Sequence, residues 1–218
     1  MEKQQIKIGV IAGTPVDTQM GVDFISQKGF QAIGESTASS PKEQNLLQFL
    51  GPKKLTQKVI SIIKDYEKQK ITRTMIYCNS LSAAIDIELI KKSVPRTKLV
   101  TPLDIYEKLA KQYSKITLWA ANGQCLSAIE KIFYEENPGI EIMGISMLPV
   151  IESIENLEPS VSIIKKFDLK SMFVNSFRPA ALVLGCTHLP YLKSVLKDEC
   201  DFPIIDPAEE MLLYLISN

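Results

Sequence analysis

Two of the four cysteines in this 218-residue chain stand in similar sequence contexts. Cys78 lies in "MIYCNSLSAAI" (75–85), and Cys186 lies in "LVLGCTHLPYL" (182–192). In each segment an apolar run precedes the cysteine, compact polar residues follow it, and a stretch with helical apolar spacing comes next. The two cysteines lie about half the chain length apart. This repetition predicts the same chemical device once in each half of a pseudo-symmetric molecule.

Loops of this kind suit proton transfer by a thiolate. A thiol at a strand-to-helix junction lies near a helix N-terminus, whose partial positive charge favours the thiolate by typically about 0.3–1 kcal/mol and by up to ~2 kcal/mol. Because one pKa unit corresponds to about 1.4 kcal/mol, the helix end alone lowers a thiol pKa by roughly one unit. A hydrogen-bonding partner is therefore also needed, and His188 is placed to supply one beside Cys186.

The same loops also suit the binding of a carboxylate. Backbone N–H groups at the two helix starts, together with Asn79, Ser80 and Thr187, provide hydrogen-bond donors for an anion. Two thiols that face one such site would remove a proton from one face of the carbon beside the carboxylate and return a proton to the other face. This scheme requires no cofactor.

Structural roles are the alternative for each of these residues. A cysteine at the end of an apolar strand is more often buried filler, and His188, the only histidine, could also be purely structural. Two matching contexts favour the functional interpretation, whereas Cys125 and Cys200 lack that context and are interpreted as free structural thiols. One histidine and no C-x-x-C pair argue against a zinc site, and a reducing compartment argues against disulfides.

The elements that would position these loops alternate along the chain between strand-like and helical patterns. The strand-like runs span residues 6–11, 74–77, 98–101, 115–120, 140–145, 180–185 and 202–206, with a weaker candidate at 31–36. Helical apolar stripes are formed by Leu55, Val59, Ile62, Ile63 and Tyr66, by Leu126, Ile129, Ile132 and Phe133, and by Leu189, Leu192, Val195 and Leu196. This alternation predicts an α/β fold with mainly parallel sheets, in which ligands bind beyond the carboxyl ends of the strands.

The composition is that of an ordinary globular chain with a sizeable core. Hydrophobic residues make up 45% and charged residues 23%, and 25 basic residues balance 25 acidic ones. Zero net charge gives no argument for nucleic acid or an anionic membrane as a partner. No apolar run approaches the roughly 18–20 residues of a membrane span, and the start "MEKQQIKIGV" lacks the pattern of a signal peptide. We therefore expect a cytoplasmic protein.

The segments around both cysteines resemble the paired motifs of the aspartate/glutamate racemase superfamily. "YCNSLSA" and "LGCTHLP" are similar to its two cysteine motifs, and the second is especially similar to that of glutamate racemases, because many aspartate racemases carry Glu where His188 stands. Weaker similarities extend over most of the chain. "IKIGVIAGTP" resembles the family's first strand and glycine loop, "GESTASSPKEQ" (34–44) resembles the glutamate racemase segment Gly-Asp-Thr-Ala-x-x-Pro-Tyr-Gly, and "IIDPAEEM" (204–211) resembles the final strand and helix.

This resemblance implies two similar α/β domains, related by a pseudo-twofold axis, with the active site in the cleft between them. The first domain would comprise residues 1–98 plus 206–218, and the second residues 99–205. The implied activity is cofactor-independent racemisation of glutamate or aspartate, with Cys78 and Cys186 as acid and base on opposite faces of the α-carbon and no metal. Family members are often dimers, so a homodimer is the partner expected besides the amino acid.

The resemblance also implies the residues of the site. His188 would assist Cys186 in catalysis. The substrate-binding residues would be Ala12, Gly13, Thr14, Pro41, Lys42, Asn79, Ser80 and Thr187, among which Lys42 is a candidate for binding a side-chain carboxylate.

The first loop departs from the glutamate racemase pattern. Glutamate racemases have Asp-Ser there, with the Asp near the first cysteine, whereas this chain has Ala12 and Gly13. Asp17 is a candidate replacement from further along the loop, and it could equally be a turn residue. The departure keeps two further functions open, a related isomerase or decarboxylase of a dicarboxylic acid and a catalytically silent amino-acid-binding protein.

Overall fold

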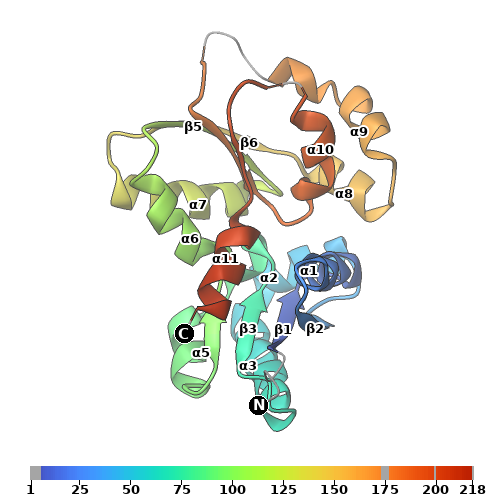
Figure 1. Cartoon of the computed structure of the whole chain (residues 1–218), viewed down its shortest axis with the longest axis vertical. Helices are drawn as coiled ribbons and strands as arrows, with labels where there is room; N and C mark the ends of the chain where they lie inside the picture. The colour runs from blue at the N-terminus through green and yellow to red at the C-terminus, as the bar shows by residue number, and fades with distance from the viewer. Residues whose placement is uncertain (1–5, 173–176, 199, 218) are drawn as a thin grey trace. The chain divides into compact units, whose positions relative to one another are not determined.

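The computed structural model describes residues 6–172, 177–198 and 200–217, and the chain divides into two compact units (Figure 1). The first unit comprises Met1–Pro102 and Ala208–Asn218, and the second comprises Leu103–Pro207. The domain boundaries expected from the sequence, at 98/99 and 205/206, lie a few residues before the boundaries of these units.

The first unit is built on a four-stranded parallel sheet with the strand order β2-β1-β3-β4. The strands are β1 (Lys7–Ala12), β2 (Gln31–Ser36), β3 (Arg73–Ile76) and β4 (Lys98–Val100). The helices are α1 (Pro15–Gln27), α2 (Pro41–Leu50), α3 (Pro52–Lys68), α4 (Asn79–Ala84), α5 (Ile87–Ser93) and α11 (Pro207–Ile216).

Strand β1 is covered on both faces. A Cβ on Gly9 would overlap the ring of Tyr66 in α3, and the Tyr66 hydroxyl donates a hydrogen bond to the Val10 carbonyl at 2.8 Å. The Val10 side chain instead lies against α1, where a Cβ on Gly21 would come within 2.8 Å of Val10 Cγ1. Because successive side chains of a strand point to opposite faces, α1 and α3 pack on opposite faces of β1. This burial on both faces explains why β1 is apolar from Ile8 to Ala12.

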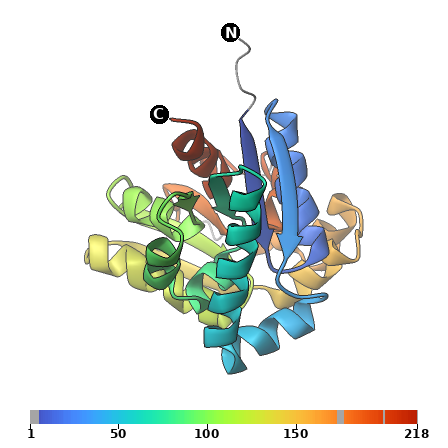
Figure 2. The ribbon, with the colours of Figure 1, turned by 90° about the horizontal axis from the view of Figure 1, so that it is seen from below.

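The C-terminal helix α11 packs beside the strands of the first unit (Figure 2). The Arg73 side chain of β3 donates from Nε to the Leu215 carbonyl at 2.8 Å, and Lys98 Nζ donates to the Ser217 carbonyl at 2.5 Å. The end of the chain is thus tied to the two strands that precede the second unit.

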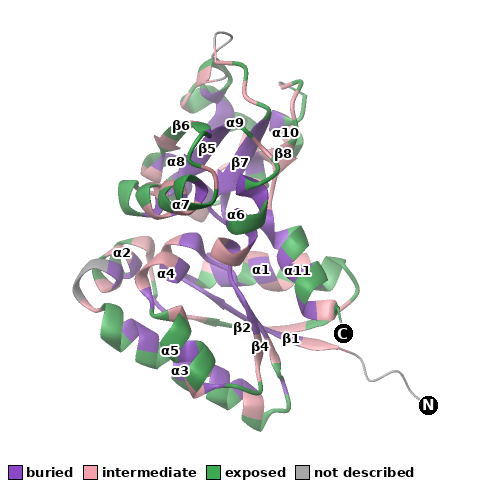
Figure 3. Ribbon diagram, turned by 90° about the vertical axis from the view of Figure 1, so that its left-hand side faces the viewer, coloured by how far each residue is buried: buried purple, intermediate pink, exposed green. Residues whose placement is uncertain are grey.

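The second unit repeats the architecture with the strand order β6-β5-β7-β8, again all parallel. Its strands are β5 (Lys115–Ala120), β6 (Glu141–Ser146), β7 (Ala181–Gly185) and β8 (Ile204–Ile205). Its helices are α6 (Pro102–Ala110), α7 (Gly123–Glu136), α8 (Leu148–Glu155), α9 (Ser160–Lys166) and α10 (Lys193–Leu196), with the 3₁₀ helices η1 (Leu169–Met172) and η2 (Leu189–Leu192). Strand β7 is buried along its whole length and β5 along nearly all of it (Figure 3).

The predicted fold class, two α/β units with parallel sheets flanked by helices, is confirmed. The weaker strand candidate at 31–36 is β2, an edge strand that is partly exposed. The stripe that begins at Leu189 differs from the expected single helix, because it forms η2 followed by the one-turn helix α10. Leu189 and Leu192 are both fully buried, and their three-residue spacing matches the period of a 3₁₀ helix.

Candidate active site

The cysteine loops lie at equivalent points of the two sheets. In the order β2-β1-β3-β4, the chain crosses from β1 to β2 on one side and from β3 to β4 on the other. Open α/β sheets bind ligands at the carboxyl ends of strands where the connections diverge in this way. Cys78 follows β3 at this point of the first unit, and Cys186 follows β7 at the corresponding point of the second.

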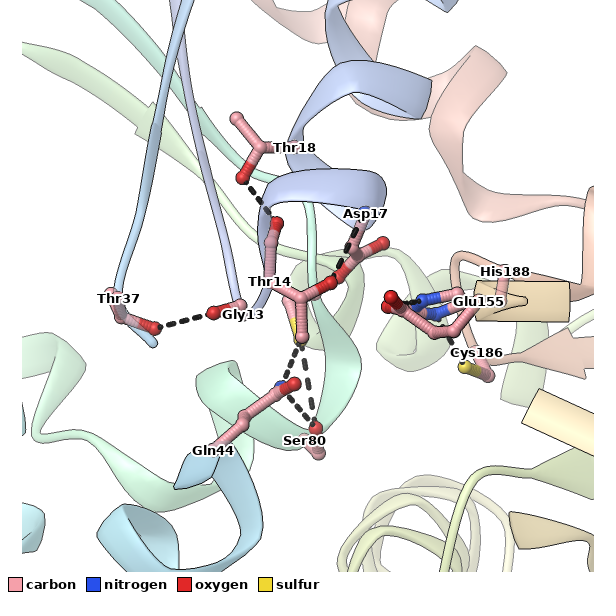
Figure 4. Close-up of polar contacts among 11 residues, drawn as sticks. Gly13, Thr14, Asp17, Thr18, Thr37, Gln44, Ser80, Glu155, Cys186 and His188 are labelled. Carbon is pink, nitrogen blue, oxygen red and sulfur yellow. Dashed lines mark hydrogen bonds and ion pairs between the residues drawn. The ribbon is translucent and has the colours of Figure 1, made fainter. Parts of the chain in front are cut away.

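Cys78 is buried at the start of α4 and has polar partners from two helices. It is the N-cap residue, only 4% exposed, and its carbonyl accepts hydrogen bonds from the Ser82 N–H and hydroxyl. The amide of Gln44 in α2 donates from Nε2 to Cys78 Sγ at 3.2 Å. The Ser80 hydroxyl lies 3.5 Å from the same sulfur. Figure 4 shows the Gln44 amide reaching toward Ser80.

The first loop, which follows β1 and contains Gly13 and Thr14, is held by backbone hydrogen bonds to the segment after β2. The Thr37 N–H donates to the Ala12 carbonyl at 3.0 Å, and the Ala38 N–H donates to the Gly13 carbonyl at 2.8 Å. Thr14 caps α1, because its side chain accepts a hydrogen bond from the Asp17 N–H at 3.2 Å. The Asp17 side chain is fully buried in the first turn of α1. A role for Asp17 beside Cys78 stays a prediction.

The segment around Pro41 and Lys42 forms the start of α2. Ser40 caps the helix, because the Glu43 N–H donates to Ser40 Oγ at 3.3 Å. Glu43 Oε2 accepts from the Ser39 N–H at 2.7 Å, and this bonding to Ser39 lowers the pKa of the Glu43 carboxyl. Pro41 occupies the first turn, and the Lys42 side chain is exposed. This arrangement leaves the predicted binding role of Lys42 untested.

Cys186 has an ionisable partner instead of an amide. Its sulfur lies 3.5 Å from His188 Nδ1, and His188 Nε2 lies 2.5 Å from Glu155 Oε1 at the end of α8 (Figure 4). All three side chains are largely buried, with Cys186 5% exposed and the His188 and Glu155 side chains 5% and 11% exposed. The Glu155 carboxylate accepts a hydrogen bond from the Nε2–H group of His188, so Nδ1 is the ring atom that faces the Cys186 sulfur.

The remaining predicted residues lie in the same loops. Asn79 is the first residue of α4 and is 2% exposed, and Thr187 lies between Cys186 and His188 and is 7% exposed. Cys125 differs from the two loop cysteines, because burial raises the pKa of its thiol and keeps it protonated. In the part of the chain that the structure describes, no group of three or more His, Cys, Asp or Glu residues is placed to hold a metal ion.

Sequence reasoning missed three polar residues of these sites, Gln44, Gln48 and Glu155. Gln44 and Gln48 lie one helical turn apart on α2 and are 9% and 3% exposed, and Gln48 Nε2 donates to Ser80 Oγ at 3.0 Å. A pair of glutamines at i and i+4 on one helix face was the available signal for the first two. Glu155 gave no such signal, because it ends an apolar helix 33 residues before its partner His188.

Comparisons with known proteins agree with this fold. No family model matches the chain. A glutamate racemase of Limosilactobacillus reuteri is 24% identical over 199 residues, which cover 89% of this chain and 69% of that protein. The structure of glutamate racemase from Francisella tularensis in complex with D-glutamate superimposes with a TM-score of 0.72 and 17% identity, covering 96% of this chain and 80% of that one.

An aspartate racemase from Picrophilus torridus superimposes equally well, with a TM-score of 0.71 and 17% identity over 97% of this chain and 93% of that one. The chain therefore has the two-unit α/β fold of the amino-acid racemases. Its resemblance to the aspartate/glutamate racemase superfamily, predicted from the two cysteine motifs, is confirmed by these similarities. Within the described residues, no helix has both the length and the apolar character that crossing a membrane requires.

Proposed function

We propose that the protein is a cofactor-independent racemase of glutamate or aspartate, with Cys78 and Cys186 as the two acid–base groups. The observation that carries this proposal is the equivalence of the two cysteines. Each follows the third strand of its unit along the chain, and each sulfur has polar partners within hydrogen-bonding distance. A two-base mechanism that inverts one carbon needs such a group on each face.

The substrate class is inferred from the relatives. The Limosilactobacillus reuteri relative is a glutamate racemase, and the Francisella tularensis structure holds D-glutamate. The Picrophilus torridus neighbour is an aspartate racemase, so both acidic amino acids stay candidates. In this proposal Ala12, Gly13 and Thr14 of the first loop, with the other predicted binding residues, hold the amino acid so that its α-carbon lies between the sulfurs.

The proposed reaction is a balanced exchange of protons between two thiols. One cysteine begins as a thiolate and the other as a thiol. The thiolate takes the α-proton, and the electron pair of the broken C–H bond passes into the substrate carboxylate. The thiol then protonates the opposite face of the carbon and becomes a thiolate, so the two cysteines have exchanged states. The opposite enantiomer reacts through the same steps in reverse order.

Deuterium exchange tests this proposal directly. We expect the purified protein in deuterium oxide to incorporate deuterium at the α-carbon of glutamate or aspartate while the opposite enantiomer accumulates. Mass spectrometry and chiral chromatography measure both, starting separately from each enantiomer of each amino acid. Stabilisation of the fold by an amino acid without any exchange would instead indicate a binding protein.

Cysteine variants assign the two bases. Cys78→Ser and Cys186→Ser should each abolish racemisation, because a serine hydroxyl is a far weaker acid than a thiol. Cys125→Ser and Cys200→Ser are the matched controls and should retain activity, since Cys125 is held as a neutral thiol and Cys200 hydrogen-bonds the Leu196 carbonyl. Full racemase activity in either of the first two variants would sink the two-base assignment.

A further inference from the structure

The Cys78 sulfur has an uncharged partner at a site where the related glutamate racemases have an acid. The first loop carries Ala12 in place of that acid, and the hydrogen bond to Sγ comes from Gln44 in α2. We propose that Gln44, with Ser80, stabilises Cys78 as a thiolate by donating hydrogen bonds to its sulfur. The inference rests on the proposed function in treating Cys78 as a reacting group.

The hydrogen bonds that Ser80 accepts leave its own hydroxyl hydrogen for the Cys78 sulfur. Ser80 Oγ accepts from Gln44 Nε2 at 3.2 Å and from Gln48 Nε2 at 3.0 Å. A hydroxyl has two acceptor positions and one hydrogen, so these two bonds occupy its acceptor positions. Its own hydrogen is then left for Cys78 Sγ, 3.5 Å away. The sulfur therefore receives one hydrogen bond from the Gln44 amide and one from the Ser80 hydroxyl, an arrangement that suits a thiolate.

Gly13 provides the space that the Gln44 amide occupies. A Cβ at position 13 would overlap the Nε2, Cδ and Oε1 atoms of Gln44. Glutamate racemases carry Ser at the matching position of the loop, so their side chain would occupy this space. Gly13 in the loop and Gln44 in α2 thus fit together, because the lack of a side chain at position 13 leaves room for the amide that donates to the Cys78 sulfur.

The Gln44 and His188 contacts give the two sulfurs chemically different partners. Gln44 does not titrate, so it stabilises the Cys78 thiolate at every pH without taking up a proton. Cys186 instead faces His188, which is in contact with Glu155 and can change its protonation state. Gln44 touches the reacting sulfur, whereas Gln48 acts only through Ser80 and is a positioning residue.

A titration of the single Cys78 thiol tests the inference without any substrate. In the full chain with Cys125, Cys186 and Cys200 replaced by Ala, the ultraviolet absorbance of the thiolate gives the Cys78 pKa. Gln44→Met keeps the volume of the side chain and removes its donors. We expect this change to raise the Cys78 pKa by about one to two units, the value of a hydrogen bond to a charged group. Gln44→Glu should raise it further, because a carboxylate repels the thiolate.

A second route removes the same hydrogen bond and leaves Gln44 in place. Gly13→Ala must displace the Gln44 side chain, so it should raise the Cys78 pKa by a similar amount. In combination with Gln44→Met it should add little, since both changes remove one interaction. Gln57→Met is the matched control, because Gln57 is exposed on α3, and it should leave the pKa unchanged.

A parallel chain that retains only Cys186 separates a specific effect from a general loosening of the fold. Gln44→Met should leave the Cys186 pKa unchanged. An unchanged Cys78 pKa in folded Gln44→Met, Gln44→Glu and Gly13→Ala, or equal shifts of both thiols, would overturn the inference. Because the titration involves no turnover, it can fail while deuterium exchange still shows racemisation, and it can succeed where racemisation fails.

Discussion

At the scale of single residues, the partners of Cys186 form a chain of three ionisable groups. Glu155 Oε1 holds His188 at Nε2, and His188 presents Nδ1 to the sulfur. A carboxylate at one end stabilises a positive imidazolium in the middle, and the imidazolium stabilises a thiolate at the other end. When the thiol is protonated, the same ring is a neutral acceptor, so the group suits both stages of the proposed reaction.

Glu155→Gln is expected to slow racemisation by about tenfold or more. The amide retains a hydrogen-bond acceptor but loses the negative charge, and a hydrogen bond involving a charged group contributes about 1.5–3 kcal/mol. Deuterium exchange from each enantiomer measures the loss, together with the pH dependence of its rate. Glu152→Gln, exposed one turn earlier on the same helix, is the control. An unchanged rate and pH profile in Glu155→Gln would show that the contact has no part in the reaction.

The loop cysteines were predictable from the sequence, whereas their partners mostly were not. Cys78 and Cys186 stand out because a polar loop follows an apolar run in both places, and His188 is adjacent in sequence to the second loop. Gln44 and Glu155 are brought to their sulfur and imidazole by helix packing across more than thirty residues. The spacing of Gln44 and Gln48 marks a polar helix face, but no local spacing tells which residue that face contacts, so only the three-dimensional structure reveals the contact.

At the scale of elements, the site depends on how closely helices approach the strands. Tyr66 of α3 packs directly over Gly9 of β1, where any side chain at position 9 would overlap its ring. The Tyr66 hydroxyl is bonded to the Val10 carbonyl, and burial raises the pKa of this phenol, which keeps it a neutral donor. The close contact fixes α3 on the strand that leads into the Gly13 loop.

Gly9→Ala is expected to destabilise the first unit by about 1–3 kcal/mol, because an overpacked core must move a rigid aromatic ring. A lower midpoint of urea unfolding, followed by far-UV circular dichroism, measures the effect. Gly123→Ala is the control, since a Cβ there meets no atom within 4 Å at the start of α7. That variant should be as stable as the wild type or slightly more stable. Equal stability of the two variants would contradict the close-packing argument.

The sequence predicted the bounds of some helices and strands more closely than those of others. Buried strands such as β1, β5 and β7 are mostly apolar, so the pattern located them within a residue or two. The N-cap Ser40 marks the start of α2, although the apolar pattern alone did not. The region after Cys186 was predicted as one helix because its apolar residues form a stripe. The three-residue spacing of Leu189 and Leu192 instead fits a 3₁₀ helix, and η2 precedes α10 in the structure.

At the scale of the whole molecule, the two units repeat one strand order and place one cysteine each at the same topological point. Neither unit alone supplies groups for both faces of a carbon. The proposed function therefore requires the two units to bring their cysteines to opposite sides of one substrate. The hydrogen bonds from Arg73 of β3 and Lys98 of β4 to the end of the chain hold the C-terminal helix on the first unit. The partners of the two sulfurs differ, whereas the positions of the two cysteines relative to the strands are equivalent.

The distance between the two sulfurs is testable in solution. If each sulfur approaches the same α-carbon to about 3–3.5 Å from opposite faces, the two sulfurs lie roughly 7 Å apart in the reactive state. A bimane reagent with two bromomethyl arms, which fluoresces once both arms have reacted, should bridge Cys78 and Cys186 within one chain. The experiment uses a variant in which Cys125 and Cys200 are replaced by Ala, so that Cys78 and Cys186 are the two thiols that remain.

The expected product is a fluorescent species with the mass of one chain plus one bridge, and its peptide map should join the segments of Cys78 and Cys186. Glutamate or aspartate should slow its formation, because the amino acid occupies the space between the thiols. Cys78→Ser and Cys186→Ser in the same background are the controls, and each should give no fluorescent bridge. Alkylation of both thiols by separate reagent molecules, with no bridge, would mean that the two cysteines do not face a common substrate. Deuterium exchange would then need a proton donor other than the second thiol.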